Sequence, residues 1–80
     1  MKIEFSDHAK SRIAFRKISK RRVLAALNKP DKSIDSFKER LVFRKKFTPK
    51  VLEVVAKMEG DIMVVVTAYY LYEGKIRQEN

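Results

Sequence analysis

The strongest constraint on the fold is the stretch of residues 51–71, in which two runs rich in β-branched and apolar residues flank Gly60-Asp61. Such runs favour strands, and glycine followed by aspartate between them is typical of a two-residue hairpin turn. Glycine supplies the positive φ that the first central position of a type II′ turn requires. We therefore predict that the fold is organised around an antiparallel hairpin that turns at Gly60-Asp61.

The expected register of this hairpin follows by counting outward from the turn. The predicted cross-strand pairs are Glu59 with Ile62, Met58 with Met63, Ala56 with Val65, Val54 with Thr67, and Leu52 with Tyr69. Because side chains alternate along a strand, one face should be apolar and needs a cover. The apolar members of that face are Leu52, Val54, Ala56, Met58, Met63, Val65 and Leu71. Thr67 and Tyr69 are the expected polar exceptions on it.

Two helices are expected before the hairpin. Ser6 and Ser19 have the residue type and position of N-caps, because a serine hydroxyl accepts a hydrogen bond from the free N–H groups of the first turn. The first helix should run from residue 7 to residue 16 or 17, and the second from residue 20 to residue 28, before Pro30. A strand over residues 2–5 precedes them, and the segments 33–38 and 41–47 are expected to be further strands.

These elements predict an α+β fold in two layers. A strand–helix–helix unit is followed by an antiparallel sheet of three to four strands, and the helices cover one face of that sheet. Residues 1–80 are expected to form a single domain, with residues 72–80 as a flexible tail. The sequence leaves open which strand the first one pairs with.

Charge is the clearest compositional indication of function. The chain of 80 residues has 19 Lys and Arg against 10 Asp and Glu, a formal net charge of +9. Such a field favours nucleic acid phosphates or an acidic protein. The lack of cysteine excludes thiolate metal sites, and a single histidine predicts no metal or other cofactor. No apolar run reaches the ~18 residues of a membrane span and no signal peptide is visible, so we expect a soluble, cytoplasmic protein.

One stripe of cationic residues could carry chemistry. His8, Arg12 and Arg16 are spaced four residues apart on the first predicted helix, so they lie on one side of it. The stripe falls beside the apolar seam of Ala9 and Ile13, where a groove between helix and sheet could form. The alternative is a solvated basic stripe, because charged side chains on helices usually lie at the surface.

Lys45 is the second unusual residue. It interrupts the apolar alternation of residues 41–47 and is predicted to share a cross-strand row with Val54 and Thr67. A lysine on an inward face is costly without a partner. Lys45, Thr67 and Tyr69 could therefore line a polar pocket with the helix stripe. The alternatives are a bulge that turns Lys45 outward, a snorkelling side chain, or core hydroxyls bonded to backbone.

The second face of the predicted sheet is also rich in apolar residues. Its expected apolar members are Val42, Val51, Val55, Ile62, Val64, Val66, Ala68 and Tyr70, mixed with Arg44, Lys46, Glu53 and Lys57. An apolar surface of this kind usually marks association. We expect a partner on this face, either a second copy of the chain or another protein.

Two motifs carry a resemblance to a known family. The opening motif, HA-x-x-R-x-x-x-R-x-I-S-x-x-x-V-x-x-x-L-x-x-P, is formed here by His8-Ala9, Arg12, Arg16, Ile18-Ser19, Val23, Leu27 and Pro30. The closing motif, similar to V-I-T-V-Y, is formed by Val65-Val66-Thr67-Ala68-Tyr69. Together they resemble a family of small uncharacterised bacterial and archaeal domains, which is similar to the RelE/BrnT superfamily of type II toxins.

This resemblance implies a fold, an activity and a partner. It implies a strand–helix–helix–sheet fold, cleavage or binding of RNA, and neutralisation by an antitoxin. Carried over by position, the implied site residues are His8, Arg12, Arg16, Thr67 and Tyr69. Lys45 is added by the pattern of the strand and not by the motif.

The leading functional hypothesis is a toxin-like, metal-independent endoribonuclease of the mRNA-interferase type. His8 is the expected general acid or base, because histidine alone among the side chains titrates near neutrality. Arg12 and Arg16 would grip the phosphate, Lys45 would add positive charge, and Tyr69 would stack on a base or position a phosphate.

Further cations and two other hypotheses complete the expectations. Arg40, Arg44 and Lys46 are expected to extend the positive track along which RNA binds. The first alternative is a basic nucleic-acid-binding module without catalysis. The second is an interaction protein that pairs through its apolar sheet face and whose charge complements an acidic partner.

Overall fold

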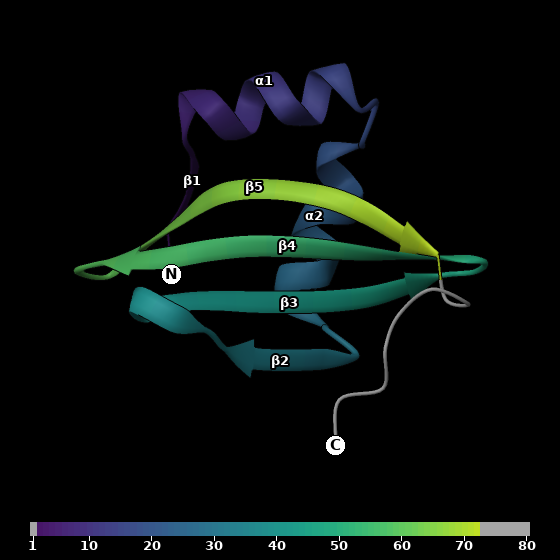
Figure 1. Ribbon diagram of the computed structural model, residues 1–80. Coiled ribbons are helices and arrows are strands. Elements are labelled where there is room, and N and C mark those ends of the chain that lie inside the picture. Colours follow the sequence, from purple (N-terminus) through teal and green to yellow (C-terminus); the bar gives the residue numbers. More distant parts are fainter. Residues whose placement is uncertain (1, 73–80) are drawn as a thin grey trace.

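Within residues 2–72, which the computed structural model describes, the chain forms a mixed sheet with two α-helices packed on it (Figure 1). The helices are α1 (Asp7–Phe15) and α2 (Lys20–Asn28), and a short 3₁₀ turn, η1, spans Phe37–Glu39. The strands are β1 (Lys2–Phe5), β2 (Lys32–Asp35), β3 (Arg40–Phe47), β4 (Lys50–Glu59) and β5 (Ile62–Tyr72). The predicted α+β class is confirmed. Tyr72 ends β5, and the rest of the predicted tail lies outside the described residues.

Strands β2 to β5 form the predicted antiparallel sheet, with four strands, and β1, whose partner the sequence left open, adds a fifth. Five strands are arranged in the order β1-β5-β4-β3-β2, and β1 runs parallel to β5. The short strand β1 brings its own apolar side chains, Ile3 and Phe5, which lie opposite Met63 and Val65. These side chains reach the helix-covered face only if β1 occupies the free edge of β5. The parallel direction also leads the chain directly into α1, which lies along β5 (Figure 1).

The helix ends are formed by the predicted serine caps. Ser6 Oγ accepts a hydrogen bond from Ala9 N at 3.0 Å, and Ser19 Oγ accepts one from Arg22 N at 3.1 Å. At its other end, α1 closes with Lys17 in the left-handed region, at φ 55°. Lys17 N then donates to Ala14 O, and Ile18 N donates to Ile13 O. This pair of bonds is a Schellman motif, which turns the chain sharply from α1 towards α2.

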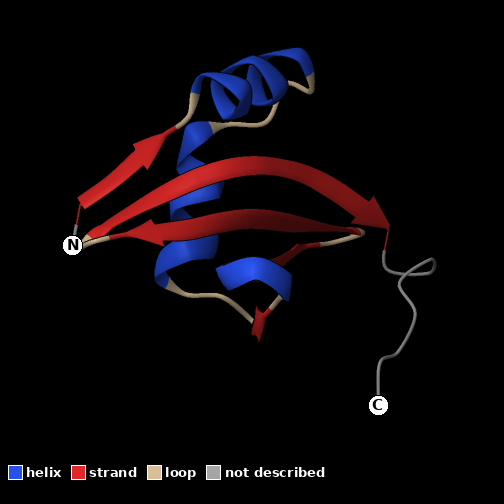
Figure 2. Cartoon of the chain, turned by 60° about the vertical axis from the view of Figure 1, so that its left-hand side comes forward, coloured by secondary structure: helices blue, strands red, loops and turns tan. Residues whose placement is uncertain are grey.

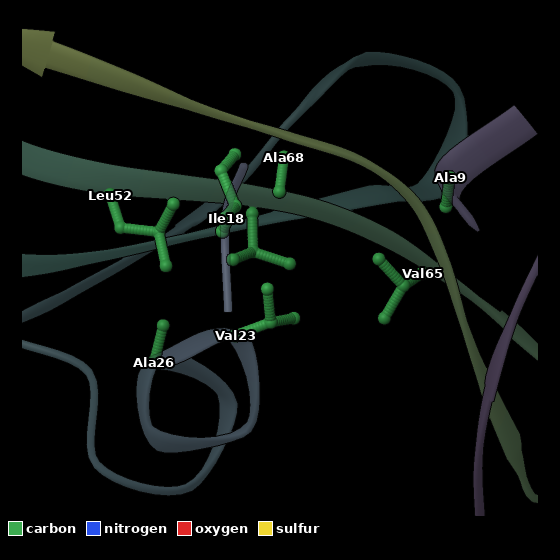
Figure 3. Close-up of a cluster of buried hydrophobic side chains, with 8 residues drawn as sticks. Ala9, Ile18, Val23, Ala26, Leu52, Val65 and Ala68 are labelled. Carbon is green, nitrogen blue, oxygen red and sulfur yellow. The ribbon is translucent and has the colours of Figure 1, made fainter. Parts of the chain in front are cut away.

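The core lies between the helices and one face of the sheet (Figure 2). Its fully or nearly buried members are Ala9, Ile18, Val23, Ala26, Leu52, Val54, Val65 and Ala68 (Figure 3). Small residues at Ala26 and Ala68 let α2 and the sheet approach closely. Ala26 is fully buried, whereas Leu24 and Leu27 are half-buried. Among residues 2–72, no helix has the length and apolar character needed to cross a membrane.

The central hairpin turns where the sequence predicts. Gly60 has a φ of 64°, and the pairs nearest the turn have the predicted register as far as Ala56 with Val65. Beyond that point a β-bulge shifts the register, because Val55 pairs with Thr67 and leaves Val66 as the extra residue on β5. A bulge inserts one residue into one strand and so reverses the facing of every residue after it.

The bulge overturns the predicted facing of Thr67 and Tyr69. The observed pairs beyond it are Val54 with Ala68, Glu53 with Tyr69, and Leu52 with Tyr70. Thr67 and Tyr69 therefore leave the helix-covered face, and Ala68 and Tyr70 take their place. The predicted pocket of Lys45, Thr67 and Tyr69 does not form, because Lys45 lies on the opposite side of the sheet from the two hydroxyls.

Lys45 does face the helices, as the alternation of its strand predicts, but in a different row. It pairs with Leu52 and not with Val54, because the turn between β3 and β4 uses only Thr48 and Pro49. Proline suits this turn since it has no N–H to give to a strand ladder. Lys45 Nζ donates to Lys29 O at 2.9 Å, at the carboxyl end of α2. The aliphatic part of the lysine side chain thus lies along the sheet, and its charged end reaches a carbonyl at the C-terminus of the helix.

The second face of the sheet is covered by neither helix (Figure 2). Val42, Val51, Val55 and Val64 lie there as predicted, but Ala68 and Tyr70 do not, because the bulge turns them to the helix side. Val51 is only 5% exposed and Val64 only 9%. The face thus offers less apolar surface than its composition indicates. A protein partner on it, an antitoxin or a second copy, stays a prediction.

Candidate nucleic-acid interface

Arg16 is the predicted site residue that the fold positions most firmly. It is the C-cap of α1, seven residues after the buried Ala9, so two helical turns bring it back to the seam that faces β5. β1 pairs with β5 only as far as Val65, and within residues 2–72 no other strand pairs with the rest of that edge. Arg16 Nη1 donates to Ala68 O at 2.9 Å and to Thr67 Oγ1 at 3.4 Å. The guanidinium is thus held at the free edge of β5.

A row of polar side chains continues from Arg16 across the uncovered face. Arg44, Glu53 and Tyr69 lie directly opposite one another on β3, β4 and β5. Arg44 Nε donates to Glu53 Oε1 at 2.6 Å, and Tyr69 Oη donates to Glu53 Oε2. The Tyr69 ring lies 5.9 Å from the guanidinium carbon of Arg16. Glu53 is only 7% exposed, so both of its oxygens are satisfied where water is scarce.

This row fixes the protonation of Tyr69. Burial of the ring, the hydrogen bond to Glu53 and the charge of Glu53 together raise the pKa of Tyr69 to about 12, against the smaller opposing effects of Arg44 and Arg16. Tyr69 therefore keeps its proton at neutral pH and directs it at Glu53. Its hydroxyl is unsuited to act as an acid or base towards a ligand, and its ring remains the part that can contact one.

The stability of the fold should fall as the pH rises from about 10 to about 12. In this range the unfolded chain releases the tyrosine proton at its ordinary pKa of 10.0, whereas Tyr69 in the folded chain keeps it until about 12. The contribution is complete below pH 10 and is lost progressively above it. Urea unfolding at stepped pH measures this, and Tyr69→Phe should show a smaller fall. An equal fall in that variant would contradict the assignment to Tyr69.

A second cluster of cations and aromatic rings lies on the helix side of the same sheet. The guanidinium carbon of Arg22 lies 4.5 Å from the ring centre of Phe47 and 6.0 Å from that of Tyr70. Arg22 Nη1 donates to Tyr70 Oη at 2.9 Å, and Lys50 Nζ lies 5.0 Å from the Tyr70 ring centre. Tyr70 and Phe47 both pack against the core, so these contacts rest on a rigid base.

Comparison with known proteins identifies the family. The model of a domain of unknown function, DUF4258, matches residues 5–70. The chain belongs to this family. The match spans both helices and all of the contacts described above. No curated protein and no solved structure matches the chain.

In this DUF4258 domain, the predicted site residues separate into three groups. Arg16, Thr67 and Tyr69 lie together at the edge of β5. His8 and Arg12 are exposed on α1, and within residues 2–72 neither side chain makes a hydrogen bond or an ion pair. Lys45 lies away from both groups, two strands from β5, at the end of α2.

The residues predicted to extend the RNA track also differ in environment. Arg44 is half-buried and its charge is offset by Glu53, so it attracts a phosphate less than an exposed arginine without an acidic partner does. Arg40 and Lys46 are exposed at the two ends of β3. Within residues 2–72, no group of three or more histidine, aspartate or glutamate side chains is placed to hold a metal ion.

The aromatic cluster around Arg22 was not predicted from the sequence. A signal was available, because the Ser19 cap fixes Arg22 on the first turn of α2 and the strand alternation places Phe47 on the helix side. The facing of Tyr70 was the missing part, since it depends on the bulge.

Proposed function

We propose that this DUF4258 domain binds RNA through its phosphates, with Arg16 as the central contact. The observation that carries the proposal is the setting of the Arg16 guanidinium. Nη1 is used by the backbone and side chain of β5, whereas Nε and Nη2 have no acceptor within residues 2–72, and the side chain is exposed. A guanidinium fixed on one side and open on the other is prepared for bidentate binding of a phosphate.

Three further features support an extended polyanion as the ligand. The net charge of +9 attracts nucleic acid from a distance. Arg12 lies one helical turn before Arg16 and is also exposed, so a second phosphate can be bound beside the first. The motif resemblance to RelE/BrnT toxins favours RNA over DNA, and it also brings the proposal of an antitoxin partner.

Binding of labelled mixed-sequence RNA at several salt concentrations tests this proposal. The affinity should fall with salt along a straight line in a double-logarithmic plot, with a slope of about −0.7 for each phosphate contacted. Two contacts, at Arg12 and Arg16, therefore give a slope of about −1.4. Fluorescence polarisation measures the affinity, and a chain that binds no RNA at low salt would rule the proposal out.

A second candidate, metal-free cleavage of the bound RNA, is favoured by the position of His8. Along a helix, His8 lies ~6 Å from Arg12 and ~12 Å from Arg16. One phosphate can therefore contact His8 and Arg12 together, while Arg16 holds its neighbour. In this arrangement His8 is the general acid or base and Arg12 stabilises the charge that develops on the phosphate. Lys45 and the Tyr69 hydroxyl take no part, because both are bonded elsewhere.

Cleavage is tested by incubating the protein with labelled RNA in EDTA. Discrete products are expected from the parent chain, and His8→Ala should abolish them because it removes the proposed general acid or base. Lys10→Ala, which changes an exposed residue of the same helix, is the matched control and should cleave normally. Equal products from the parent and from His8→Ala would remove His8 from the mechanism. RNA binding without products would leave binding as the function.

A further inference from the structure

We propose that Arg22, backed by the rings of Phe47 and Tyr70, is a base-stacking subsite that makes single-stranded RNA the preferred ligand over duplex RNA. The inference rests on the proposed function, because the stacked base belongs to the same RNA strand whose phosphate Arg16 binds. Arg22, Phe47 and Tyr70 belong to neither of the two motifs that carry the family resemblance.

The geometry of Arg22 supports stacking on one side of its guanidinium. Its central carbon lies 4.5 Å from the Phe47 ring centre, a distance at which the guanidinium lies over the ring. The bond from Nη1 to Tyr70 Oη at 2.9 Å fixes the rotation of the group. Phe47 and Tyr70 are in turn packed against the buried core, so the platform is formed before any ligand arrives.

The guanidinium of Arg22 has room for a further contact. Arg22 is exposed, and within residues 2–72 its guanidinium contacts no ring or acceptor other than Phe47 and Tyr70. Unpaired bases stack on arginine planes as well as on aromatic rings, and such stacking tolerates any base. A base placed there would continue the stack of Phe47 and Arg22 outward. Lys50, 5.0 Å from the Tyr70 ring centre, supplies a further positive charge for the backbone of the same nucleotide.

Arg16 and Arg22 both bond to β5. Arg16 Nη1 donates to Ala68 O, and Arg22 Nη1 donates to the hydroxyl of Tyr70, two residues further along the strand. In the proposed complex, a phosphate lies at Arg16 and an unpaired base of the same RNA strand lies at Arg22. In a duplex each base is already stacked and paired, so no face is free for Arg22. The subsite consequently selects unpaired RNA.

Polarisation titrations with one labelled RNA sequence, as a single strand and as a duplex, test the inference. The intact chain should bind the single strand about tenfold more tightly or better. Arg22→Lys keeps the charge but removes the planar group, so it should lose most of this preference while the salt dependence of binding is retained. Arg21→Lys, on the same helix and equally exposed, is the matched control and should behave like the parent.

A second probe separates stacking from charge. A single strand of the same length that carries no bases should bind the parent more weakly than the intact strand, and Arg22→Lys should bind the two strands more nearly alike. Equal binding of single strand and duplex by the parent, or an unchanged preference in Arg22→Lys, overturns the inference and leaves the proposed function standing. If the parent binds neither RNA, the proposed function is wrong and the inference falls with it.

Discussion

Replacing Glu53 with alanine should lower the free energy of unfolding by about 3 kcal/mol. Glu53 is 7% exposed and accepts bonds from both Arg44 and Tyr69. Its loss leaves the half-buried Arg44 charge and the Tyr69 hydroxyl without their partner, and an unpaired buried charge is far more costly than a missing contact. Urea unfolding followed by circular dichroism measures the change.

Two controls separate this effect from the loss of any carboxylate. Glu59→Ala removes an exposed glutamate whose partner, Lys57, is also exposed, and it should cost about 0.5 kcal/mol or less. The double change Arg44→Met with Glu53→Leu removes both charges of the pair, so it should destabilise the fold less than Glu53→Ala alone. A Glu53→Ala variant as stable as Glu59→Ala would show that the polar row does not stabilise the sheet.

Replacing Arg16 with alanine should weaken RNA binding by about tenfold to a hundredfold, the effect of losing a charge-assisted pair of hydrogen bonds. The salt slope should also become shallower by about 0.7, because one phosphate contact disappears. Arg16→Lys should keep most of the slope but only part of the affinity, since an ammonium group cannot bind a phosphate with two parallel bonds. Polarisation titrations give both quantities.

The control for this prediction is again on α1. Lys10→Ala removes one exposed positive charge from the same helix without touching β5, and it should reduce the affinity about twofold. If Lys10→Ala and Arg16→Ala weaken binding equally, the protein binds RNA through its overall charge and not through Arg16.

The helices and the turn of the hairpin could be predicted because their signals are local. Ser6 and Ser19 are caps that act within three residues, and both make the expected bonds. Gly60 sets its turn by its own backbone angle. The α+β class followed from these elements, and so did the cover of one sheet face by helices.

The bulge could not be predicted, and it decides which residues share a face. Val65-Val66-Thr67 is an unbroken β-branched run with neither a glycine nor a change of pattern to mark an extra residue. The bulge aligns Tyr69 with Glu53, where the pair satisfies its polar atoms together, and Ala68 with Val54, where a small side chain suits the core. These favourable contacts can be recognised only when the pairing of the strands is known. Simple alternation along the sequence therefore assigns Thr67 and Tyr69 to the wrong face.

The part of β5 beyond Val65, which has no strand on its β1 side within residues 2–72, has a consequence for solubility. A strand edge with free backbone groups is a template on which other chains can add and aggregate. Arg16 occupies the Ala68 carbonyl and fixes a positive charge at that edge, so an incoming strand meets a blocked acceptor and a repelling cation. Arg16, which is proposed to bind RNA, thus also protects the sheet against pairing with strands of other chains. Selection for binding and selection against aggregation would then act on the same side chain.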